Sequence, residues 1–322
     1  MNGEFNLIDK YFVGKQKQRK DVLLAAGDDC AIVQAPDNLA IAISTDTLVE
    51  GTHFLKNADP AWVAHKALAS NISDLAAMGA TPSWVSFALT MPEVDEEWLK
   101  PFCDAFFKLA DYYDIQLIGG DTTKGPLAIT LTIQGFVPVE GALKRSGANV
   151  GDWIYVTGNL GDSKAGLDVI LDSNKREHPH ADELEKRHFV SSPRVLTGQA
   201  LQGVATSAID ISDGLISDLG HILKSSNVGA SVDVSQLPIS DELVAFLGSQ
   251  EKALQYALSS GEEYELCFTV DSNAKSSLET LLVHTGTPVS CIGMIRPQGR
   301  IELHRDGEEL DWDLTGFDHF KG

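Results

Sequence analysis

Strand-like and helix-like stretches alternate along this chain, and the alternation starts a second time near its middle. Stretches with a two-residue period predict strands and those with a 3.6-residue period predict helices. In the first half these are strands at 39–45, 84–89, 115–120 and 127–137, and helices at 60–78 and 95–113. A turn-rich segment at 147–158 then introduces a new strand. Because 322 residues suffice for two domains, we expect an α/β fold with domains at 1–148 and 149–322.

The second half again mixes both kinds of element, with predicted strands at 207–212, 230–234 and 264–270 and predicted helices at 163–172, from 193, from 215, through 241–258 and at 275–284. A stretch at 176–188 is rich in charged residues and contains His178, His180 and His188. Such a composition is more typical of a solvated surface segment than of a metal site. We therefore expect these three histidines at the surface.

The charge balance limits the partners that the chain is able to bind. Lys and Arg number 25 against 46 Asp and Glu, so the formal net charge is −21. A field of that sign repels phosphate backbones and anionic lipid, so we expect neither a nucleic-acid nor a membrane partner. A phosphorylated ligand would need another source of positive charge, and divalent cations are the obvious one. The basic run at 15–20 is expected to be a solvated, flexible segment.

Targeting signals and cysteine pairs are not evident in the sequence. The first twenty residues contain no apolar core of a signal peptide, and no stretch approaches 18 consecutive apolar residues. The four cysteines lie far apart without a C-x-x-C pair, which argues against a zinc site or a disulfide framework. These features predict a cytoplasmic protein. The sequence also lacks the P-loop, dinucleotide-binding, H-E-x-x-H and G-x-S-x-G motifs, which weakens the corresponding enzyme classes.

Five short segments place aspartates among small or apolar residues: 27–33, 43–54, 71–80, 117–125 and 209–220. We expect these carboxylates to be buried, and a buried carboxylate needs a hydrogen bond, a cation or a metal ion. Only Lys124 and Arg145 lie close in sequence. Mg²⁺ suits such a set because it prefers oxygen ligands, takes few carboxylates and completes its shell with water and phosphate oxygens. The segments therefore predict a phosphate site with several magnesium ions.

Each aspartate also has a purely structural interpretation. Asp28 and Asp29 would fit a turn, Asp121 would close a turn after a strand, and Asp213 would cap the helix that follows Gly214. Asp74 is harder to explain in this way, because aspartate is a poor residue for the middle of a helix. Taken singly the two interpretations have about equal weight, and taken together the five segments favour the metal site.

The same five segments, with four others, resemble the thiamine-monophosphate kinase family in type and order. The segments are GEF-x-LI-x-x-YF (3–12), GDDCA (27–31), ISTDTLVEGTHF (43–54), NISDLAAMGA (71–80), IGGDTT (118–123), RSGA-x-x-GD (145–152), IDISDGL (209–215), GEEYEL (261–266) and GFDHF (316–320). The resemblance spans nearly the whole chain. It implies a two-domain fold like that of aminoimidazole-ribonucleotide synthetase, with an N-terminal domain that pairs in a homodimer through a β-barrel and a C-terminal α/β domain.

The resemblance also implies an activity and a set of site residues. Family members transfer the γ-phosphoryl group of ATP to thiamine monophosphate, which yields thiamine diphosphate and ADP. By the matching motifs, the magnesium ligands would be Asp29, Ser44, Thr45, Asp46, Asp74, Asp121, Asp210 and Asp213. Nucleotide contacts would come from Tyr112, Gly120, Asp121, Arg145 and Ser212, and contacts to thiamine phosphate from His53, Glu262 and Phe317. Asp46, Asp121 and Asp213 would be the residues most directly involved in catalysis. The family often has Trp or Tyr at the position of Phe317.

The chemistry agrees with direct in-line transfer without a phosphoenzyme. The attacking phosphate oxygen is already anionic near neutral pH, so positioning and charge neutralisation matter more than a strong general base. Two other interpretations remain open. One is a sister activity of the same fold, although residues 1–26 lack the reactive cysteine of a selenophosphate synthetase. The other is a regulator that binds a metal-bound nucleotide without turnover.

Overall fold

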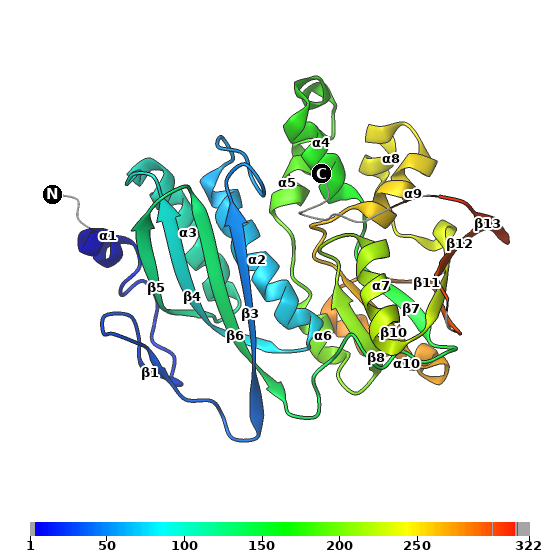
Figure 1. The fold of residues 1–322 in the computed structure, drawn as a ribbon, viewed down its shortest axis with the longest axis horizontal. Coiled ribbons are helices and arrows are strands. Elements are labelled where there is room, and N and C mark those ends of the chain that lie inside the picture. Colours follow the sequence, from blue (N-terminus) through cyan, green and yellow to red (C-terminus); the bar gives the residue numbers. More distant parts are fainter. Residues whose placement is uncertain (1–3, 298, 313, 315–322) are drawn as a thin grey trace. The chain divides into compact units, whose positions relative to one another are not determined.

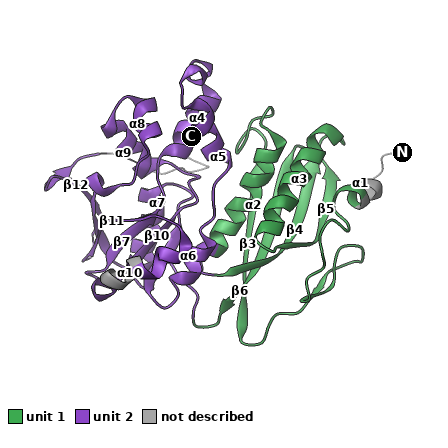
Figure 2. Cartoon of the chain, turned by 180° about the vertical axis from the view of Figure 1, so that it is seen from behind, with its two compact units in different colours: residues 1–75, 80–140 green, residues 76–79, 141–322 purple. Residues whose placement is uncertain are grey.

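The computed structural model describes residues 4–297, 299–312 and 314 of the 322-residue chain. It divides into two compact units, which Figure 2 shows in different colours. Unit 1 comprises residues 1–75 and 80–140, and unit 2 comprises residues 76–79 and 141–322. Both units contain helices and a β-sheet (Figure 1), so the two-domain α/β architecture expected from the sequence is confirmed.

Unit 1 is built on a four-stranded sheet with the order β3-β6-β4-β5. Neighbouring strands are antiparallel except β4 and β5, which are parallel. A separate pair of short strands, β1 and β2, precedes the sheet. The elements are α1 (Glu4–Tyr11), β1 (Val22–Leu24), β2 (Ile32–Val33), β3 (Leu39–Val49), α2 (Pro60–Ala77), β4 (Thr81–Met91), α3 (Glu96–Tyr112), β5 (Gln116–Lys124) and β6 (Ala128–Pro138).

The two long helices of unit 1 begin where the sequence predicts. The Asp59 side chain accepts a hydrogen bond from the backbone N–H of Ala61 (2.8 Å), and Asp95 caps α3 in the same way. α2 ends before Gly79, whose φ of +69° suits glycine. Both helices cover one face of the sheet (Figure 2). Stacked rings of Phe87 and Phe106, with centroids 5.6 Å apart, are part of the core between α3 and the sheet.

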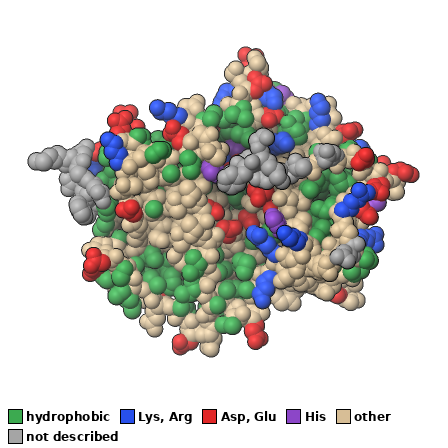
Figure 3. All heavy atoms as spheres, viewed as in Figure 1, with side chains coloured by type: hydrophobic (Ala, Val, Ile, Leu, Met, Phe, Trp, Pro, Cys, Tyr) green, Lys and Arg blue, Asp and Glu red, His purple; other side chains and the backbone are tan. Residues whose placement is uncertain are grey.

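The helices of the described residues leave the other face of this sheet uncovered (Figure 1). Along β3, Ile41 and Ile43 alternate with half-buried residues and are 42% and 64% exposed. Next to them, the hydroxyls of Thr45 and Thr132 are hydrogen-bonded at 2.9 Å across β3 and β6. Figure 3 shows mainly hydrophobic and uncharged side chains on this face, in the left half of the view. The sheet remains open: within the described ranges, no sheet of this single chain closes into a barrel.

Unit 2 contains a seven-stranded sheet with the order β13-β12-β9-β11-β7-β10-β8, in which only the β12–β9 pair is parallel. The strands are β7 (Trp153–Thr157), β8 (Ala205–Asp210), β9 (Gly229–Asp233), β10 (Leu266–Val270), β11 (Val289–Arg296), β12 (Ile301–Arg305) and β13 (Glu308–Leu310). The α-helices are α4 (Asp162–Leu171), α5 (Ala181–Phe189), α6 (Val195–Ala200), α7 (Leu215–Ser226), α8 (Asp241–Leu247), α9 (Gln250–Ser259) and α10 (Lys275–Leu282). Short 3₁₀ turns lie at Ser173–Glu177, Val234–Gln236, Ser272–Ala274 and Val283–Thr285.

The main core of unit 2 lies between this sheet and α7. Ile154 and Ile209 from the strands and Leu219 and Ile222 from α7 belong to one buried cluster, and each is at most 2% exposed. None of the helices in the described residues is long and apolar enough to cross a membrane. All four cysteines are free thiols.

Two surface predictions from the sequence are wrong. His188 is only 2% exposed, because it lies four residues after Leu184 on the face of α5 that packs inward. The basic run is not simply solvated either. Arg19 forms ion pairs with Asp21 (2.8 Å) and Asp114 (2.5 Å), so this residue ties the segment to unit 1.

Candidate active site

In unit 1, β3 and α2 bring three of the predicted magnesium ligands together. Ser44 and Asp46 alternate on the face of β3 that meets α2. The hydroxyl of Ser44 donates a hydrogen bond to Oδ2 of Asp74, although the two residues are 30 positions apart. This contact gives Asp74 a tertiary partner, and Asp74 lies in the last turn of α2 and not near its middle.

The environment of this group disfavours negative charge. Burial raises the pKa of Asp46 to about 6, and the neighbouring charge of Asp74 adds to the effect. A hydrogen bond from Ser70, one helical turn before Asp74, acts in the opposite direction and lowers the pKa. Two carboxyl groups held together in this way would gain from a cation between or beside them.

His53 lies in the turn after β3 and is held through both its ring and its backbone. The N–H of Val49 donates to Nδ1 (3.0 Å), so Nδ1 is the acceptor and the proton of a neutral ring is on Nε2. The ammonium group of Lys66 donates to the carbonyl of His53 (3.0 Å). Lys66 is 1% exposed, and the sequence analysis missed it. A lysine within the mostly apolar stretch 61–69 of α2 was the signal that could have identified it.

Two other predicted ligands of unit 1 lie on the opposite side of the sheet. The Thr45 hydroxyl bonds to Thr132 on the uncovered face, so it does not join the group around Asp46. Asp121 lies within β5 and pairs in register with Ala88 of β4, on the same uncovered face. β5 is three strands away from β3 in the sheet, which corresponds to about 14 Å at the usual strand spacing. In one copy of the chain, Asp46 and Asp121 therefore occupy opposite faces and opposite edges.

The expectation that all five segments bury their aspartates is wrong for the first and the fourth. Asp28, Asp29 and Asp121 are exposed. The N–H of Asp29 is bonded to the side chain of Asp28 (2.9 Å), as in a turn, whereas Asp121 does not close a turn because β5 continues to Lys124. These exposed positions need no compensating charge from the protein itself.

Gly120 and Tyr112 were predicted to contact nucleotide. A Cβ atom at Gly120 would lie 1.9 Å from the carbonyl oxygen of Phe87, so the close approach of β4 and β5 already requires glycine there. Tyr112 ends α3 with 79% of its surface exposed. Gly120 is also exposed, so both residues lie at the surface of unit 1.

In unit 2, two irregular segments bring a second group of predicted residues together. The first, 211–214, connects β8 to α7, and the second, 260–265, connects α9 to β10. Asp210 ends β8 and is 4% exposed. The N–H of Glu262 donates to the carbonyl of Ser212 (2.7 Å), and the N–H of Tyr264 donates to the carbonyl of Ile211 (2.9 Å). Ser212 was predicted to contact the nucleotide and Glu262 to contact thiamine phosphate, and the two are neighbours here.

Asp218, which the sequence analysis missed, shapes the first of these segments. One oxygen of its carboxyl group accepts hydrogen bonds from the N–H groups of Ser212 and Asp213, each at 3.0 Å. Burial raises the pKa of Asp218 to about 7. Asp213 does not cap α7, since Gly214 occupies the capping position with a φ of +109°. The side chain of Asp213 is therefore not needed by the helix.

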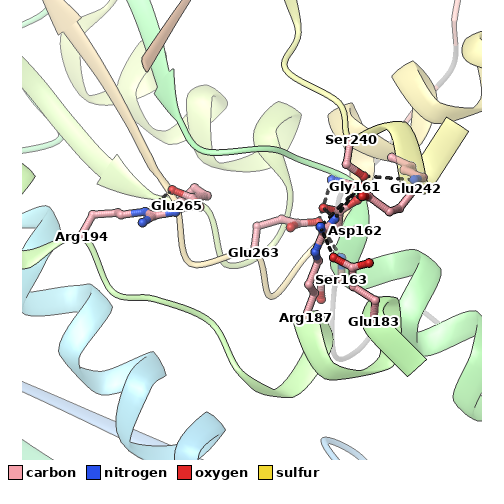
Figure 4. A network of polar contacts seen from close by, with 11 residues as sticks. Gly161, Asp162, Ser163, Glu183, Arg187, Arg194, Ser240, Glu242, Glu263 and Glu265 are labelled. Carbon is pink, nitrogen blue, oxygen red and sulfur yellow. Dashed lines mark hydrogen bonds and ion pairs between the residues drawn. The ribbon is translucent and has the colours of Figure 1, made fainter. Parts of the chain in front are cut away.

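The second segment is held by the start of α4. The carboxyl group of Glu263 accepts hydrogen bonds from the N–H groups of Gly161 (2.8 Å) and Ser163 (3.2 Å), as Figure 4 shows. Burial raises the pKa of Glu263 to about 8. Two residues later, Glu265 forms a two-point ion pair with Arg194 (Nε to Oε2, 2.7 Å). Glu262 and Tyr264 have positive φ angles of 59° and 55°, which non-glycine residues adopt only where the surroundings enforce them.

The remaining predicted residues contribute less to this geometry. Arg145 is exposed, and its carbonyl accepts a hydrogen bond from Ser226 (3.4 Å). Phe317 lies outside the described residues.

The donor chemistry of unit 1 suits magnesium. Among the described residues, no group of three or more His, Cys, Asp and Glu side chains is close enough to hold a metal ion by itself. Mg²⁺ needs no such cage, because it binds through one or two carboxylates and completes its shell with water and substrate phosphates. Asp46 and Asp74, with the Ser44 hydroxyl beside them, provide such a pair.

Comparison with known proteins places both halves of the chain in one class. Residues 27–137 match the description "AIR synthase related protein, N-terminal domain", and residues 149–306 match "AIR synthase related protein, C-terminal domain". The fold is therefore that of the AIR synthase-related proteins, as the resemblance implied.

Individual relatives narrow this class. The chain is 54% identical over 321 residues to the thiamine-monophosphate kinase of Escherichia coli K12, covering 99% of this chain and 98% of that one. The solved thiamine-monophosphate kinase of Stenotrophomonas maltophilia K279a has a TM-score of 0.86 and 42% identity, covering 96% and 98% of the two chains. The structure named "AaThiL complexed with AMPPCP and TMP" has a TM-score of 0.78 and 30% identity, covering 99% and 97%. The chain belongs to the thiamine-monophosphate kinase family, a family of enzymes.

Proposed function

We propose that this enzyme transfers the γ-phosphoryl group of ATP to the phosphate of thiamine monophosphate, which gives thiamine diphosphate and ADP. The observation that carries the proposal is the group of Ser44, Asp46 and Asp74, two adjacent carboxyl groups and a hydroxyl held between β3 and α2. Supporting it are the relatives named thiamine-monophosphate kinase and the AaThiL complex with AMPPCP and TMP.

The proposed reaction joins two anionic substrates on a chain whose net charge is −21. Several magnesium ions, when bound, would neutralise the phosphate oxygens and the charge that develops during transfer. Asp46 and Asp74 would hold such ions in unit 1, and Asp210 and Asp213 in unit 2. Asp29, Thr45 and Asp121 complete the proposed ligand set, Thr45 through its backbone carbonyl because its hydroxyl is turned away.

The other residues of the chain bind and orient the substrates. His53 would donate a hydrogen bond from Nε2 to the phosphate of thiamine monophosphate, since its Nδ1 accepts from Val49. Glu262 would attract the positively charged thiazolium ring, and Phe317 would stack on the thiamine rings. Tyr112, Gly120, Arg145 and Ser212 would contact ATP. No strong general base is required, because the attacking phosphate oxygen is already anionic, and transfer would occur directly in line.

The placement of Asp121 leads to a second part of the proposal. Within one chain Asp121 lies at the opposite edge and face of the sheet from Asp46. We propose a homodimer in which the sheets of two copies meet at their uncovered faces and close into a β-barrel, with Asp121 of each copy acting in the site of the other. The exposed Ile41 and Ile43 on that face support this, because burying them would stabilise the dimer.

A fluorescence assay tests the proposed activity. Purified protein is incubated with MgATP and thiamine monophosphate, and thiamine diphosphate is followed after oxidation to its thiochrome derivative. Controls omit the metal ion or replace the monophosphate by free thiamine. Magnesium-dependent product from the monophosphate alone is expected. If ATP binds without product, the fold would serve a sister activity or a regulatory role instead.

A further inference from the structure

His188 is a buried histidine that none of the roles above uses. It lies in the last turn of α5, and its side chain is 3% exposed. Its Nε2 atom is 3.5 Å from Oε2 of Glu262, an ion-pair distance. On the other side of the ring, Nδ1 lies 3.1 Å from both the hydroxyl and the carbonyl oxygen of Ser163 in the first turn of α4. The ring therefore bridges α4 and the segment that carries Glu262.

The contacts of Nδ1 determine what Nε2 offers to Glu262. If the Ser163 hydroxyl donates to Nδ1, the proton of a neutral imidazole is on Nε2 and faces the carboxylate. If Nδ1 instead donates to the Ser163 carbonyl, Nε2 attracts the carboxylate only in the doubly protonated ring. Both attractive arrangements place a proton on Nε2, directed at one oxygen of Glu262.

The packing of α4 against α5 fixes the ring. A Cβ atom at Gly166 would lie 2.2 Å from the carbonyl oxygen of Leu184 and 2.8 Å from Cβ of His188. Glycine at this position thus allows the two helices to approach closely enough for the Ser163 contact. Because His188 has little room to move, its Nε2–H has a defined direction.

Glu262 is itself held in an uncommon conformation. Its φ is +59°, and its N–H is bonded to the carbonyl of Ser212 (2.7 Å). The next residue, Glu263, is anchored to the N–H groups of Gly161 and Ser163 at the start of α4 (Figure 4). The first turn of α4 therefore fixes two successive carboxyl groups, that of Glu263 directly and that of Glu262 through His188.

We infer that His188 is a positioning residue that orients the Glu262 carboxylate for the thiamine part of the substrate. The inference rests on the proposed function, in which Glu262 contacts thiamine monophosphate. The contact of one Glu262 oxygen with His188 fixes the orientation in which the carboxylate would meet the cationic ring. An unoriented carboxylate would bind the same substrate less well, because its side chain would lose rotational freedom only on binding.

The test compares His188→Leu, which removes the donor, with His188→Gln, which retains an amide donor. For His188→Leu we expect the KM for thiamine monophosphate to rise about 10-fold, with the KM for ATP and kcat changed by less than about 3-fold. His188→Gln should restore most of the loss. In a Glu262→Ala background, His188→Leu should cause no further rise, because the interaction it supports is already absent. His221→Gln, at an exposed position of α7, is the matched control.

Specific results would overturn the inference. An equal rise in KM for both substrates, a failure of His188→Gln to recover, or independent effects of His188→Leu and Glu262→Ala would assign His188 a merely structural role. If His188→Leu does not fold, Ser163→Ala carries the same test, since it removes one of the two groups that set the ring. If Glu262→Ala leaves the KM for thiamine monophosphate unchanged, the proposed role of Glu262 fails. If Glu262→Ala raises it and His188→Leu does not, only the present inference fails.

Discussion

The two units hold their candidate residues in different ways. In unit 1, Ser44 and Asp46 lie on a regular strand and Asp74 on a regular helix, and side chains make the contacts between them. In unit 2, Ser212, Asp213 and Glu262 lie on irregular backbone between β8, α7, α9 and β10. There the contacts are mostly from backbone N–H groups, such as those of Ser212 and Asp213 to the Asp218 carboxyl group.

The two arrangements predict different responses to substitution. A strand and a helix position side chains through core packing, so a single polar substitution in unit 1 should alter the chemistry and leave the backbone intact. An irregular segment depends on each of its hydrogen bonds, and its positive φ angles at Glu262 and Tyr264 persist only because the surroundings enforce them. Substitutions around unit 2 should therefore affect both function and local stability.

Substituting one proposed magnesium ligand in each unit tests whether both halves serve one reaction. Asp46→Asn and Asp213→Asn should each lower kcat by about 10²-fold or more, because each removes a carboxylate that would hold magnesium. Steady-state kinetics with thiamine monophosphate measure this, and circular dichroism verifies the fold. Asp37→Asn, at an exposed loop position of unit 1, should leave kcat unchanged. Near-normal turnover of Asp213→Asn would limit the active site to unit 1.

A mixing experiment tests whether Asp46 and Asp121 of unit 1 act in the same subunit. Asp46→Asn and Asp121→Asn variants, each nearly inactive, are co-refolded or co-expressed so that subunits exchange. If Asp121 acts in the site of the other copy, a mixed dimer contains one intact site, and about a quarter of the wild-type activity should return. A mixture no more active than its components would place both aspartates in the same subunit's site or would contradict the dimer.

A smaller effect is expected at the turn after β3. His53→Ala should raise the KM for thiamine monophosphate about 10-fold and that for ATP much less, because it removes a single donor to the substrate phosphate. Initial-rate measurements with each substrate varied in turn separate the two constants. Equal changes in both would indicate that His53 supports the turn, through its Nδ1 contact with Val49, and does not contact thiamine monophosphate.

The anchoring of the irregular segment in unit 2 is tested through stability and not through turnover. The pKa of Glu263 is raised from 4.5 to about 8, so between these pH values the unfolded chain has released a proton that the folded chain retains. This group therefore stabilises the fold most fully below about pH 4.5, and its contribution is lost progressively as the pH rises towards about 8. Glu263→Gln removes that dependence.

Urea unfolding between pH 5 and pH 8 measures the effect. The free energy of unfolding of Glu263→Gln should fall less steeply with pH than that of the wild type, whereas Glu251→Gln, at an exposed position of α9, should follow the wild type. Parallel curves for Glu263→Gln and the wild type would mean that Glu263 is ionised in the folded protein at neutral pH.

Much of unit 1 was predictable because its elements have regular periods and clear ends. Asp59-Pro60 and Asp95 begin helices as predicted, and the alternation from residue 39 gives β3. The two-residue period of a strand already implies that Thr45 and Asp46 point to opposite faces. The sequence did not reveal on which face Asp121 lies, since that depends on the register of four strands. It also suggested buried aspartates at 28, 29 and 121, which are exposed.

In unit 2, the important contacts are long-range and leave little trace in local sequence. His188 lies in a segment dominated by charged residues, and only the packing of α5 against α4 shows that it is buried. The role of Asp218 depends on the turn that precedes α7, where capping by Asp213 was one of the two interpretations of the sequence. Hydrogen bonds from the backbone determine the position of Asp218, and the packing of α5 against α4 determines that of His188.

The proposed function requires that a phosphoryl group moves directly from ATP to thiamine monophosphate. The most direct measurement incubates the purified enzyme with magnesium, ATP labelled with ³²P in the γ-phosphate, and thiamine monophosphate. The proposed function predicts that the label appears in the terminal phosphate of thiamine diphosphate and that the protein stays unlabelled. Label found only in free phosphate, or bound to the protein in the absence of thiamine monophosphate, would contradict it.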